Sequence, residues 1–308
     1  MSTFPDGLFM YGGVPVGGSD LFTTGSVFFV SSVTGAASNT GMKVDQALSK
    51  IDDAVGKCTA NKGDIIVVMP GHTETVTAAA GLVLDVAGIK IIGIGSGSLR
   101  PTVNFTTAVG ADMDIDAANV TIKNILFTGG IDELTGPIDI NAADCTLLNI
   151  ETRDVTGQAT DFIVTNADAD RLLIDGWVHR GAAAAGADTA ITIVGGADIG
   201  IRNFNIYGNF AVSAIENVTT AATRINIGGG DGWNYIWTAN AADTCITLVS
   251  TTTGFVGPNI AAMLKDNAAN ITEAFVGAAA QFIQPISIVN LAGESSMDTN
   301  ITASTDAN

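Results

Sequence analysis

The sequence predicts an all-β fold, a right-handed single-stranded parallel β-helix with an N-terminal capping helix. Three observations predict it: a six-residue pattern of alternating apolar residues occurs five times in the middle of the 308-residue chain, Gly or Asn always stands fifth in it, and short polar linkers separate the apolar segments. Successive copies are 25 to 31 residues apart. A period of this length indicates a solenoid whose coils each contain three short strands.

The composition allows a large core and excludes two classes of partner. Hydrophobic residues make up 47% of the chain and charged residues 14%, so most of it is expected to be ordered. The formal net charge is −18, and no basic run could neutralise the phosphates of a nucleic acid. Asp, Asn and Gly interrupt every apolar stretch before it reaches the roughly 20 residues of a membrane-spanning helix. We therefore expect neither nucleic acid nor membrane as a partner.

The N-terminal segments are predicted to be an arm, a strand and a cap. Residues 1–24 are expected to form an extended arm because they are rich in Gly and Pro, and residues 25–31 read as a strand. Residues 43–57, KVDQALSKIDDAVGK, have apolar residues at helical spacing and Gly56 at the end. Because an open solenoid needs a cap, this helix is predicted to cover the first coil. The strand at 64–69 is then predicted to start the stack.

The repeated pattern is predicted to form one sheet of the solenoid. Its first and third residues are apolar and its second is usually polar, which is typical of a strand with one face toward a core. The fifth residue is expected to bend the chain, because Gly and Asn adopt left-handed backbone angles most readily. Asn124, Asn149 and Asn203 are expected to hydrogen-bond between coils. The copies start at Ile89, Val120, Cys145, Leu172 and Ile199, and a degenerate sixth is centred on Ile225 or Ile227.

A second column of apolar pairs precedes the first and predicts a second sheet, and a short third strand, as at 126–127 and 205–207, closes each coil. The segments between strands lack the helical periodicity that a doubly wound α/β fold requires, and the calcium-binding nonapeptide pattern does not recur. The β-helix is therefore assigned to residues 25–250. The pairs of the second column are Met113 and Ile115, Ile138 and Ile140, Phe162 and Val164, Ile191 and Ile193, Ile215 and Val218, and Ile246 and Leu248.

The C-terminal residues 251–308 lose the repeat and are predicted to form a cap or interaction segment. A short helix is expected at 260–266, and the apolar segment 282–291 is expected to cap the last coil or to form a sheet between subunits. The polar stretch 295–308 is expected to be exposed unless a partner orders it.

The order of these elements resembles the pectate-lyase-like right-handed β-helix superfamily. The residues that carry the resemblance are the helix at 43–57, GDIIVVMPGH at 63–72 and the repeated IxNI or IxNF coils, and it covers about residues 25–250. The opening FPDGLFMYGGVPVGG at 4–18 and PGHTETVTAAAG at 70–81 also resemble β-helix proteins encoded among the virion structural genes of tailed bacteriophages. That second resemblance implies a virion component, such as a head decoration protein or a spike.

No catalytic constellation can be matched in the sequence. The resemblance implies a cluster of calcium-binding Asp residues with a basic proton abstractor, but most of the Asp residues near Arg153 and Arg171 occupy predicted turns. His72 and His179 lack the GxSxG context of a nucleophile, and packing or surface roles are favoured for both. Carboxylate pairs for sugar hydrolysis could be presented almost anywhere along neighbouring coils. The Asp residues considered are Asp154, Asp161, Asp168, Asp170 and Asp175.

The cysteines do not suggest a disulfide framework or a metal site. Cys58, Cys145 and Cys245 are odd in number, far apart and not in a CxxC pair. No catalytic residue, cofactor or metal is therefore predicted, and the chain is expected not to be an enzyme.

Aromatic residues concentrate in the later coils and are candidates for a carbohydrate-binding strip or a contact with another subunit: Trp177, Tyr207, Trp233, Tyr235 and Trp237. Trp177 occupies the position of Ile125 and Phe204 in the repeat and is expected in the core. Trp233, Tyr235 and Trp237 form a less regular run, for which packing and a contact with another subunit or a glycan are equally favoured.

These observations favour a virion structural protein, a phage capsid decoration or cement protein that stabilises the head. Its expected partners are itself, as a homotrimer, and the major capsid protein of a phage head. Its expected location is the virion, after synthesis in the host cytoplasm, because the N-terminus has no secretion signal. The alternative is a tail-spike-like β-helix that binds or cleaves surface polysaccharide. A groove of carboxylates and aromatics on one sheet would favour the spike, and small Ala, Thr and Gly side chains would favour decoration.

Overall fold

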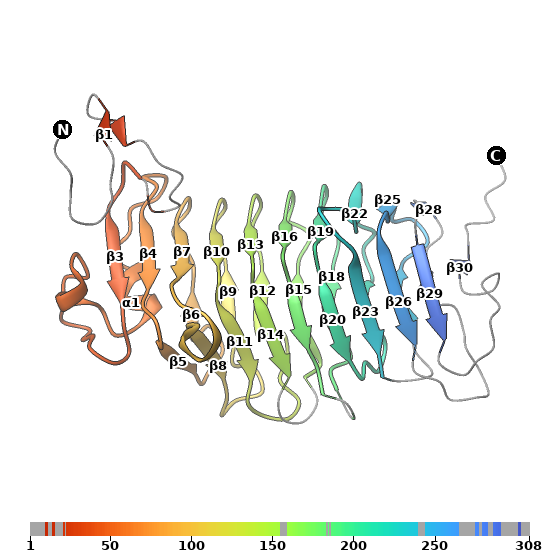
Figure 1. The fold of residues 1–308 in the computed structure, drawn as a ribbon, viewed down its shortest axis with the longest axis horizontal. Helices are drawn as coiled ribbons and strands as arrows, with labels where there is room; N and C mark the ends of the chain where they lie inside the picture. The colour runs from red at the N-terminus through yellow and green to blue at the C-terminus, as the bar shows by residue number, and fades with distance from the viewer. Residues whose placement is uncertain are drawn as a thin grey trace.

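The protein is a parallel β-helix in which three sheets run along the whole stack (Figure 1). The computed structural model describes residues 10–11, 14–15, 21, 23–154, 159–182, 184, 186–239, 244–264, 275–276, 279–282, 286–290 and 301–302. Each strand pairs in parallel with the equivalent strand of the next coil. The predicted fold class is confirmed.

Sheet one has ten strands and contains the repeated pattern. In chain order they are β3 (Val27–Val30), β4 (Ile65–Val68), β7 (Lys90–Gly93), β10 (Thr121–Lys123), β13 (Thr146–Leu148), β16 (Leu173–Asp175), β19 (Gly200–Arg202), β22 (Ile225–Ile227), β25 (Thr253–Val256) and β28 (Ala279–Phe282).

Sheet two has nine strands and follows the bend in each coil. They are β5 (Thr73–Val76), β8 (Thr102–Phe105), β11 (Leu126–Gly129), β14 (Glu151–Asp154), β17 (Val178–Arg180), β20 (Asn205–Gly208), β23 (Asn234–Thr238), β26 (Ile260–Leu264) and β29 (Ile286–Asn290).

Sheet three also has nine strands and closes the coil. They are β6 (Leu82–Val83), β9 (Met113–Ile115), β12 (Ile138–Ile140), β15 (Asp161–Thr165), β18 (Thr189–Ile193), β21 (Ser213–Asn217), β24 (Thr244–Leu248), β27 (Phe275–Val276) and β30 (Ile301–Thr302). A hairpin of β1 (Met10–Tyr11) and β2 (Val14–Pro15) precedes the stack.

One row of stacked apolar side chains runs along the interior of sheet one. The predicted centres of the five copies face one another across successive coils, and Ile227 is the centre of the sixth. The row also extends beyond the predicted repeat at both ends, and all of its members are buried. They are Phe28, Ile66, Ile91, Ile122, Leu147, Ile174, Ile201, Ile227 and Val256.

The predicted bends adopt left-handed angles at four of the five positions. Asn124, Asn149, Gly176 and Asn203 have φ of 57°, 49°, 75° and 52°. Gly93 is required for space instead, because a Cβ there would lie 2.3 Å from the carbonyl oxygen of Asn124.

The bend asparagines also connect coils, as predicted for two of the three. The Nδ2 of Asn124 donates to the carbonyl of Gly93 at 2.9 Å, and the Nδ2 of Asn203 donates to Oδ1 of Asp175 at 2.6 Å. Asn149 connects coils through its backbone, since its carbonyl accepts a hydrogen bond from Arg100.

The predicted second column is wrong by one residue in two strands, because polar side chains lie inside. In β15 the register sets Ile163 opposite Ile138 and Thr165 opposite Ile140, where Phe162 and Val164 were predicted to be the inward pair. In β21 the inward residue after Ile215 is Asn217 and not Val218.

The N-terminal cap is a shorter helix than the one predicted over 43–57. The segment forms a 3-10 turn at Val44–Gln46, a bridge between Leu48 and Val30, and the helix α1 (Ile51–Val55). The backbone of Leu48 bonds to Phe29 and Ser31, so the chain covers the free edge of sheet one before the helix begins. A second 3-10 turn, Gly97–Leu99, precedes β8.

The C-terminal residues continue the solenoid, contrary to the prediction. Residues 260–264 form β26, which pairs with β23, where a helix was predicted. Ile260 and Ala262 are buried, so tertiary pairing overrides the helical propensity of the Ala, Met and Leu residues in this segment. The segment 282–291 contributes to β28 and β29 of the same chain. Apart from β1, β2, Leu21, residues 23–24 and β30, the predicted arm at 1–24 and tail at 295–308 lie outside the described residues.

The apolar core is continuous along the stack, and its largest buried side chains are aromatic, including Trp177, which confirms the prediction for that residue. No helix in the described part of the chain is long and apolar enough to cross a membrane.

Asn217 provides a test of the polar residues inside the solenoid. Its Nδ2 donates to the carbonyls of Ile193 at 2.7 Å and Thr220 at 2.9 Å, and its Oδ1 accepts from Thr252 and from the N–H of Ala222. Replacing Asn217 with Ala leaves these buried groups unpaired, so we predict a loss of about 2–3 kcal/mol of unfolding free energy, measured by urea denaturation. The exposed Asn226→Ala on β22 should cost under about 0.5 kcal/mol. Equal effects of the two substitutions would contradict a structural role for Asn217.

Candidate functional site

The outer face of sheet two gathers side chains from distant parts of the sequence. Alternate residues of each strand face the core, so the others form two rows on the outside. Adjacent members of each row come from adjacent coils. The first row contains Thr128, Arg153, Arg180, Tyr207 and Trp237, and the second contains Leu126, Glu151, Val178, Asn205 and Tyr235.

The aromatic cluster, which we define as Tyr207, Tyr235 and Trp237, lies at one end of these rows. The exposed fractions of Tyr235 and Trp237 are 50% and 43%. The rings of Tyr207 and Trp237 meet edge to face, with centroids 5.4 Å apart and an interplanar angle of 85°. The cluster borders a hollow of about 380 Å³, to which the next strand contributes Ala261 and Ala262. The hollow is lined by Asn205, Tyr207, Tyr235, Ile236, Trp237, Ala261 and Ala262.

The structure places the three predicted contact residues unequally. Tyr235 and Trp237 line the hollow, whereas Trp233, which precedes β23, is 44% exposed but does not. Tyr207, which aligns with Trp237, joins the cluster from the preceding coil. The concentration of aromatic residues in the later coils was the sequence signal that grouped them.

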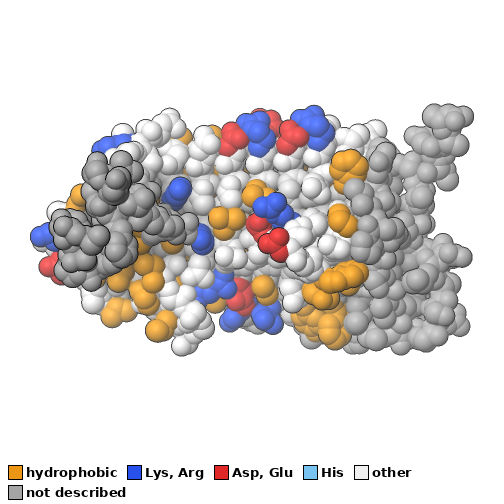
Figure 2. All heavy atoms as spheres, turned by 45° about the horizontal axis from the view of Figure 1, so that its top comes forward, with side chains coloured by type: hydrophobic (Ala, Val, Ile, Leu, Met, Phe, Trp, Pro, Cys, Tyr) orange, Lys and Arg blue, Asp and Glu red, His pale blue; other side chains and the backbone are white. Residues whose placement is uncertain are grey.

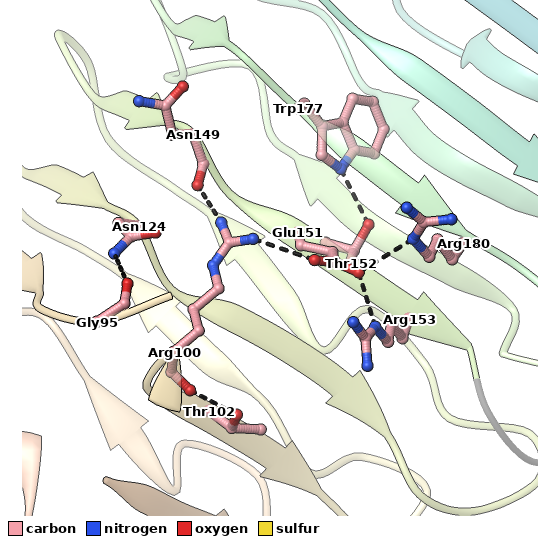
Figure 3. Close-up of polar contacts among 10 residues, drawn as sticks. All are labelled: Gly95, Arg100, Thr102, Asn124, Asn149, Glu151, Thr152, Arg153, Trp177 and Arg180. Carbon is pink, nitrogen blue, oxygen red and sulfur yellow. Dashed lines mark hydrogen bonds and ion pairs between the residues drawn. The ribbon is translucent and has the colours of Figure 1, made fainter. Parts of the chain in front are cut away.

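The arginine cluster, which we define as Arg100, Arg153, Arg180 and Glu151, lies beside the aromatic cluster. Oε1 of Glu151 accepts hydrogen bonds from Nε of Arg153 at 2.7 Å and from Nε of Arg180 at 3.2 Å. Oε2 accepts from Arg100 at 3.1 Å. Figure 3 shows the carboxylate between Arg153 and Arg180 on one side and Arg100 on the other.

Burial separates the inner and outer members of the arginine cluster. The side chains of Arg100 and Glu151 are 16% and 12% exposed, against 43% and 65% for Arg153 and Arg180. Burial lowers the pKa of Arg100, and its Nε has no hydrogen-bond partner. Three cations surround one carboxylate, so the cluster carries an excess of two positive charges. Sequence reasoning missed this cluster, although Arg153 and Arg180 are one repeat apart.

The acidic residues considered in the sequence do not form one site. Asp154 points into the core from sheet two, Asp161 accepts from Thr189 and Thr192 on sheet three, and Asp175 pairs with Arg202 on sheet one. Asp168 and Asp170 lie in a turn, where Oδ1 of Asp170 accepts from the N–H of Ala197. These four places on the coil do not bring the five carboxylates into one cluster.

Both histidines are buried and have structural partners. His179 lies among Phe162, Trp177 and Phe210, and burial lowers its pKa to about 3. The hydroxyl of Thr152 accepts from Nε1 of Trp177 at 2.9 Å, so it is free to donate to Nδ1 of His179 at 2.8 Å.

His72 connects the first coil to the cap. Its Nδ1 accepts from the N–H of Ser32 at 2.9 Å, and its Nε2 lies 3.3 Å from Oε2 of Glu74. That same oxygen accepts from the N–H of Ile51, the first residue of α1. This network fixes the helix to sheet two.

The described residues contain no group of three or more His, Cys, Asp or Glu that could hold a metal ion. Burial raises the pKa of Cys245 to about 12 and, with Asp64 nearby, that of Cys58 to about 12. Burial also raises the pKa of Cys145. These thiols are therefore poor nucleophiles.

Comparison with known proteins gives likeness at the level of the fold. No family model and no curated protein matches the sequence. A GH136 lacto-N-biosidase from Eubacterium ramulus resembles the structure over 86% of this chain and 68% of its own, at 11% identity and a TM-score of 0.46. A rhamnogalacturonan lyase resembles it over 88% of this chain and 89% of its own, at 11% identity and a TM-score of 0.38.

The comparison corrects the expectation that the chain is not an enzyme. Both similar structures are named as enzymes, whereas the expectation was drawn from unmatched motifs alone. A motif search cannot find catalytic groups that neighbouring coils bring together from positions a full repeat apart. At this identity and TM-score the likeness assigns neither activity to this chain, and neither name indicates a phage protein.

Asp154 provides a test of the electrostatics inside sheet two. Burial raises its pKa from 3.8 to about 6, so the ionised carboxylate destabilises the folded state. This penalty is absent below pH 4, grows as the pH rises from about 4 to 6, and is constant above. We therefore predict that the melting temperature of Asp154→Asn, relative to wild type, increases through that window. The exposed Asn226→Ala, which changes no titratable group, should show a pH-independent difference, and a flat profile for Asp154→Asn would contradict the raised pKa.

Proposed function

We propose that this chain binds saccharide on the outer face of sheet two, with the aromatic cluster as the surface on which sugar rings stack. The observation that carries the proposal is the hollow bordered by Tyr207, Tyr235 and Trp237. Aromatic side chains combine an apolar face with a polar tip and suit ligands that have both. A concave, mainly apolar site with a few polar groups is the usual form of a ligand site.

The polar groups of the hollow suit the hydroxyl groups of a sugar. Asn205 contributes an amide that both donates and accepts, and the two tyrosines contribute phenolic hydroxyls. Successive coils repeat every 4.8 Å or so, which presents similar contacts at regular intervals to a polymer of similar units.

The exposure of the cluster supports a ligand more than a packing role. The equivalent inward residues, Ile206 and Ile236, already fill the core, at 0% and 1% exposure. The outward rings thus add no core packing. A contiguous patch of exposed apolar side chains generally marks a contact site.

Substituting Trp237 tests the proposal. Trp237→Ala removes the largest ring of the hollow, so we predict at least a tenfold loss of affinity, about 1.4 kcal/mol, for the saccharide that binds best on an array of bacterial surface glycans. Calorimetry with that saccharide measures the loss. Phe255→Ala on sheet one, where the ring is 45% exposed, is the matched control and should bind like wild type. Equal binding by both variants, or no glycan bound by wild type, contradicts the proposal.

We propose as a second function that the chain is a virion surface component of a tailed phage, made in the host cytoplasm. The resemblance of residues 4–18 and 70–81 to such proteins supports this proposal. Of the two virion roles considered, the aromatic cluster with Glu151 on one sheet favours a polysaccharide-binding spike. The small polar residues of the early coils, Thr73, Thr75 and Thr102, are those expected of a decoration protein attached to a major capsid protein.

The virion proposal predicts a homotrimer. Light scattering after size exclusion should give a mass of three times 31.3 kDa. Most soluble oligomers are closed, symmetric assemblies of one kind of chain. A strict monomer at micromolar concentration contradicts the trimer, and leaves the saccharide proposal in place.

A further inference from the structure

We infer that the saccharide bound at the aromatic cluster carries an anionic group, which Arg153 and Arg180 receive. The inference rests on the proposed function of that cluster and adds the chemical class of its ligand: a saccharide with carboxylate or sulfate substituents.

The strand register places the two clusters in one row. Arg153 lies opposite Arg180, Arg180 opposite Tyr207, and Tyr207 opposite Trp237. Each step is one coil, about 4.8 Å. A polymer that stacks on Trp237 and Tyr207 and continues along the row therefore reaches the guanidinium of Arg180 next.

The arginine cluster has a surplus of charge that its own carboxylate does not neutralise. Glu151 is the one carboxylate that the described strands of sheet two present on the outer face, and three guanidinium groups contact it. Figure 2 shows basic side chains gathered around an acidic one at the lower edge of this view, next to a hydrophobic group. In a chain of net charge −18 with 13 Lys and Arg in all, such a concentration of cations is unusual.

The other ion pairs of the solenoid provide the contrast. Arg202 pairs with Asp175, Arg171 with Asp144 and Arg224 with Asp198, and in each pair an Asp from the preceding coil contacts the Arg. Figure 2 shows adjoining acidic and basic side chains along its upper edge. Pairs of this kind balance their charge, whereas the arginine cluster does not. Exposed ion pairs contribute little to stability, so folding alone does not require two further cations around Glu151.

Glu151 positions the exposed guanidinium groups. Its bonds to Arg153 and Arg180 engage Nε, one of the five N–H groups of each guanidinium. A guanidinium binds carboxylate or sulfate through parallel N–H bonds. The nearly buried Arg100 holds Glu151 from the other side, so the two outer arginines are ordered before a ligand arrives.

Two matched pairs of probes test the inference on the full chain. Hyaluronan oligosaccharide is compared with its methyl ester, and dextran sulfate with dextran, by calorimetry at low and at physiological salt. We expect wild type to bind the anionic member of at least one pair tenfold or more tightly than the neutral member. The pair that shows the preference distinguishes carboxylate from sulfate recognition, and the preference should weaken with salt.

The variants separate this inference from the proposed function. The double substitution Arg153→Gln with Arg180→Gln should abolish the preference while the neutral probe binds as before. The corresponding double Lys variant should retain part of the preference for the anionic probe. Arg171→Gln, in the turn before β16, should retain all of that preference. Trp237→Ala should weaken binding of both members of a pair.

Each result has one meaning. Equal affinity for charged and neutral probes, or an unchanged preference in the double Gln variant with a wild-type melting temperature, overturns the inference and leaves saccharide binding intact. Failure of all four probes to bind also overturns the inference, whereas full binding by Trp237→Ala overturns the proposed function and the inference with it.

Discussion

The parallel register between coils is the constraint on which the rest of the structure depends. The interior row of sheet one contains residues such as Ile122, Leu147 and Ile174. These aliphatic side chains can stack only if the strands of successive coils pair in the same register. A slip of one residue would expose the row and bury the polar face. The left-handed bends at Asn124 and Asn203 make the next strand of each coil begin at the equivalent position, whatever the length of the loops that follow.

The same register explains how a site arises from residues without a common sequence motif. Arg153, Arg180, Tyr207 and Trp237 come from four successive coils and meet because their strands are aligned. Loops vary in length without disturbing that row. The inner row fixes the backbone, so the outer row is free to vary in chemistry from small polar groups to cations and then to aromatic rings.

This separation explains how much the sequence could predict. The interior of sheet one was predictable because its apolar residues alternate. The bend positions were predictable because every copy of the repeat has Gly or Asn there. Asn217 and Thr165 were misassigned since their hydrogen bonds inside the solenoid replace apolar contacts, which periodicity cannot detect. Residues 260–264 were assigned to a helix because Ala, Met and Leu favour helices when no neighbouring strand is considered. The arginine cluster was missed because outward positions have no apolar signal, and because Arg100 joins it from a turn at the start of β8.

The difference between the two clusters follows from what each must do for a ligand. An aromatic ring needs no orientation beyond that of its strand, so Trp237 and Tyr207 can be held by edge-to-face contact alone. A guanidinium has a long flexible side chain and loses entropy on binding unless it is already held. Glu151 removes part of that cost at the two exposed arginines, and Arg100 keeps Glu151 in place. The nearly buried pair of Arg100 and Glu151 thereby orders the cations at the surface.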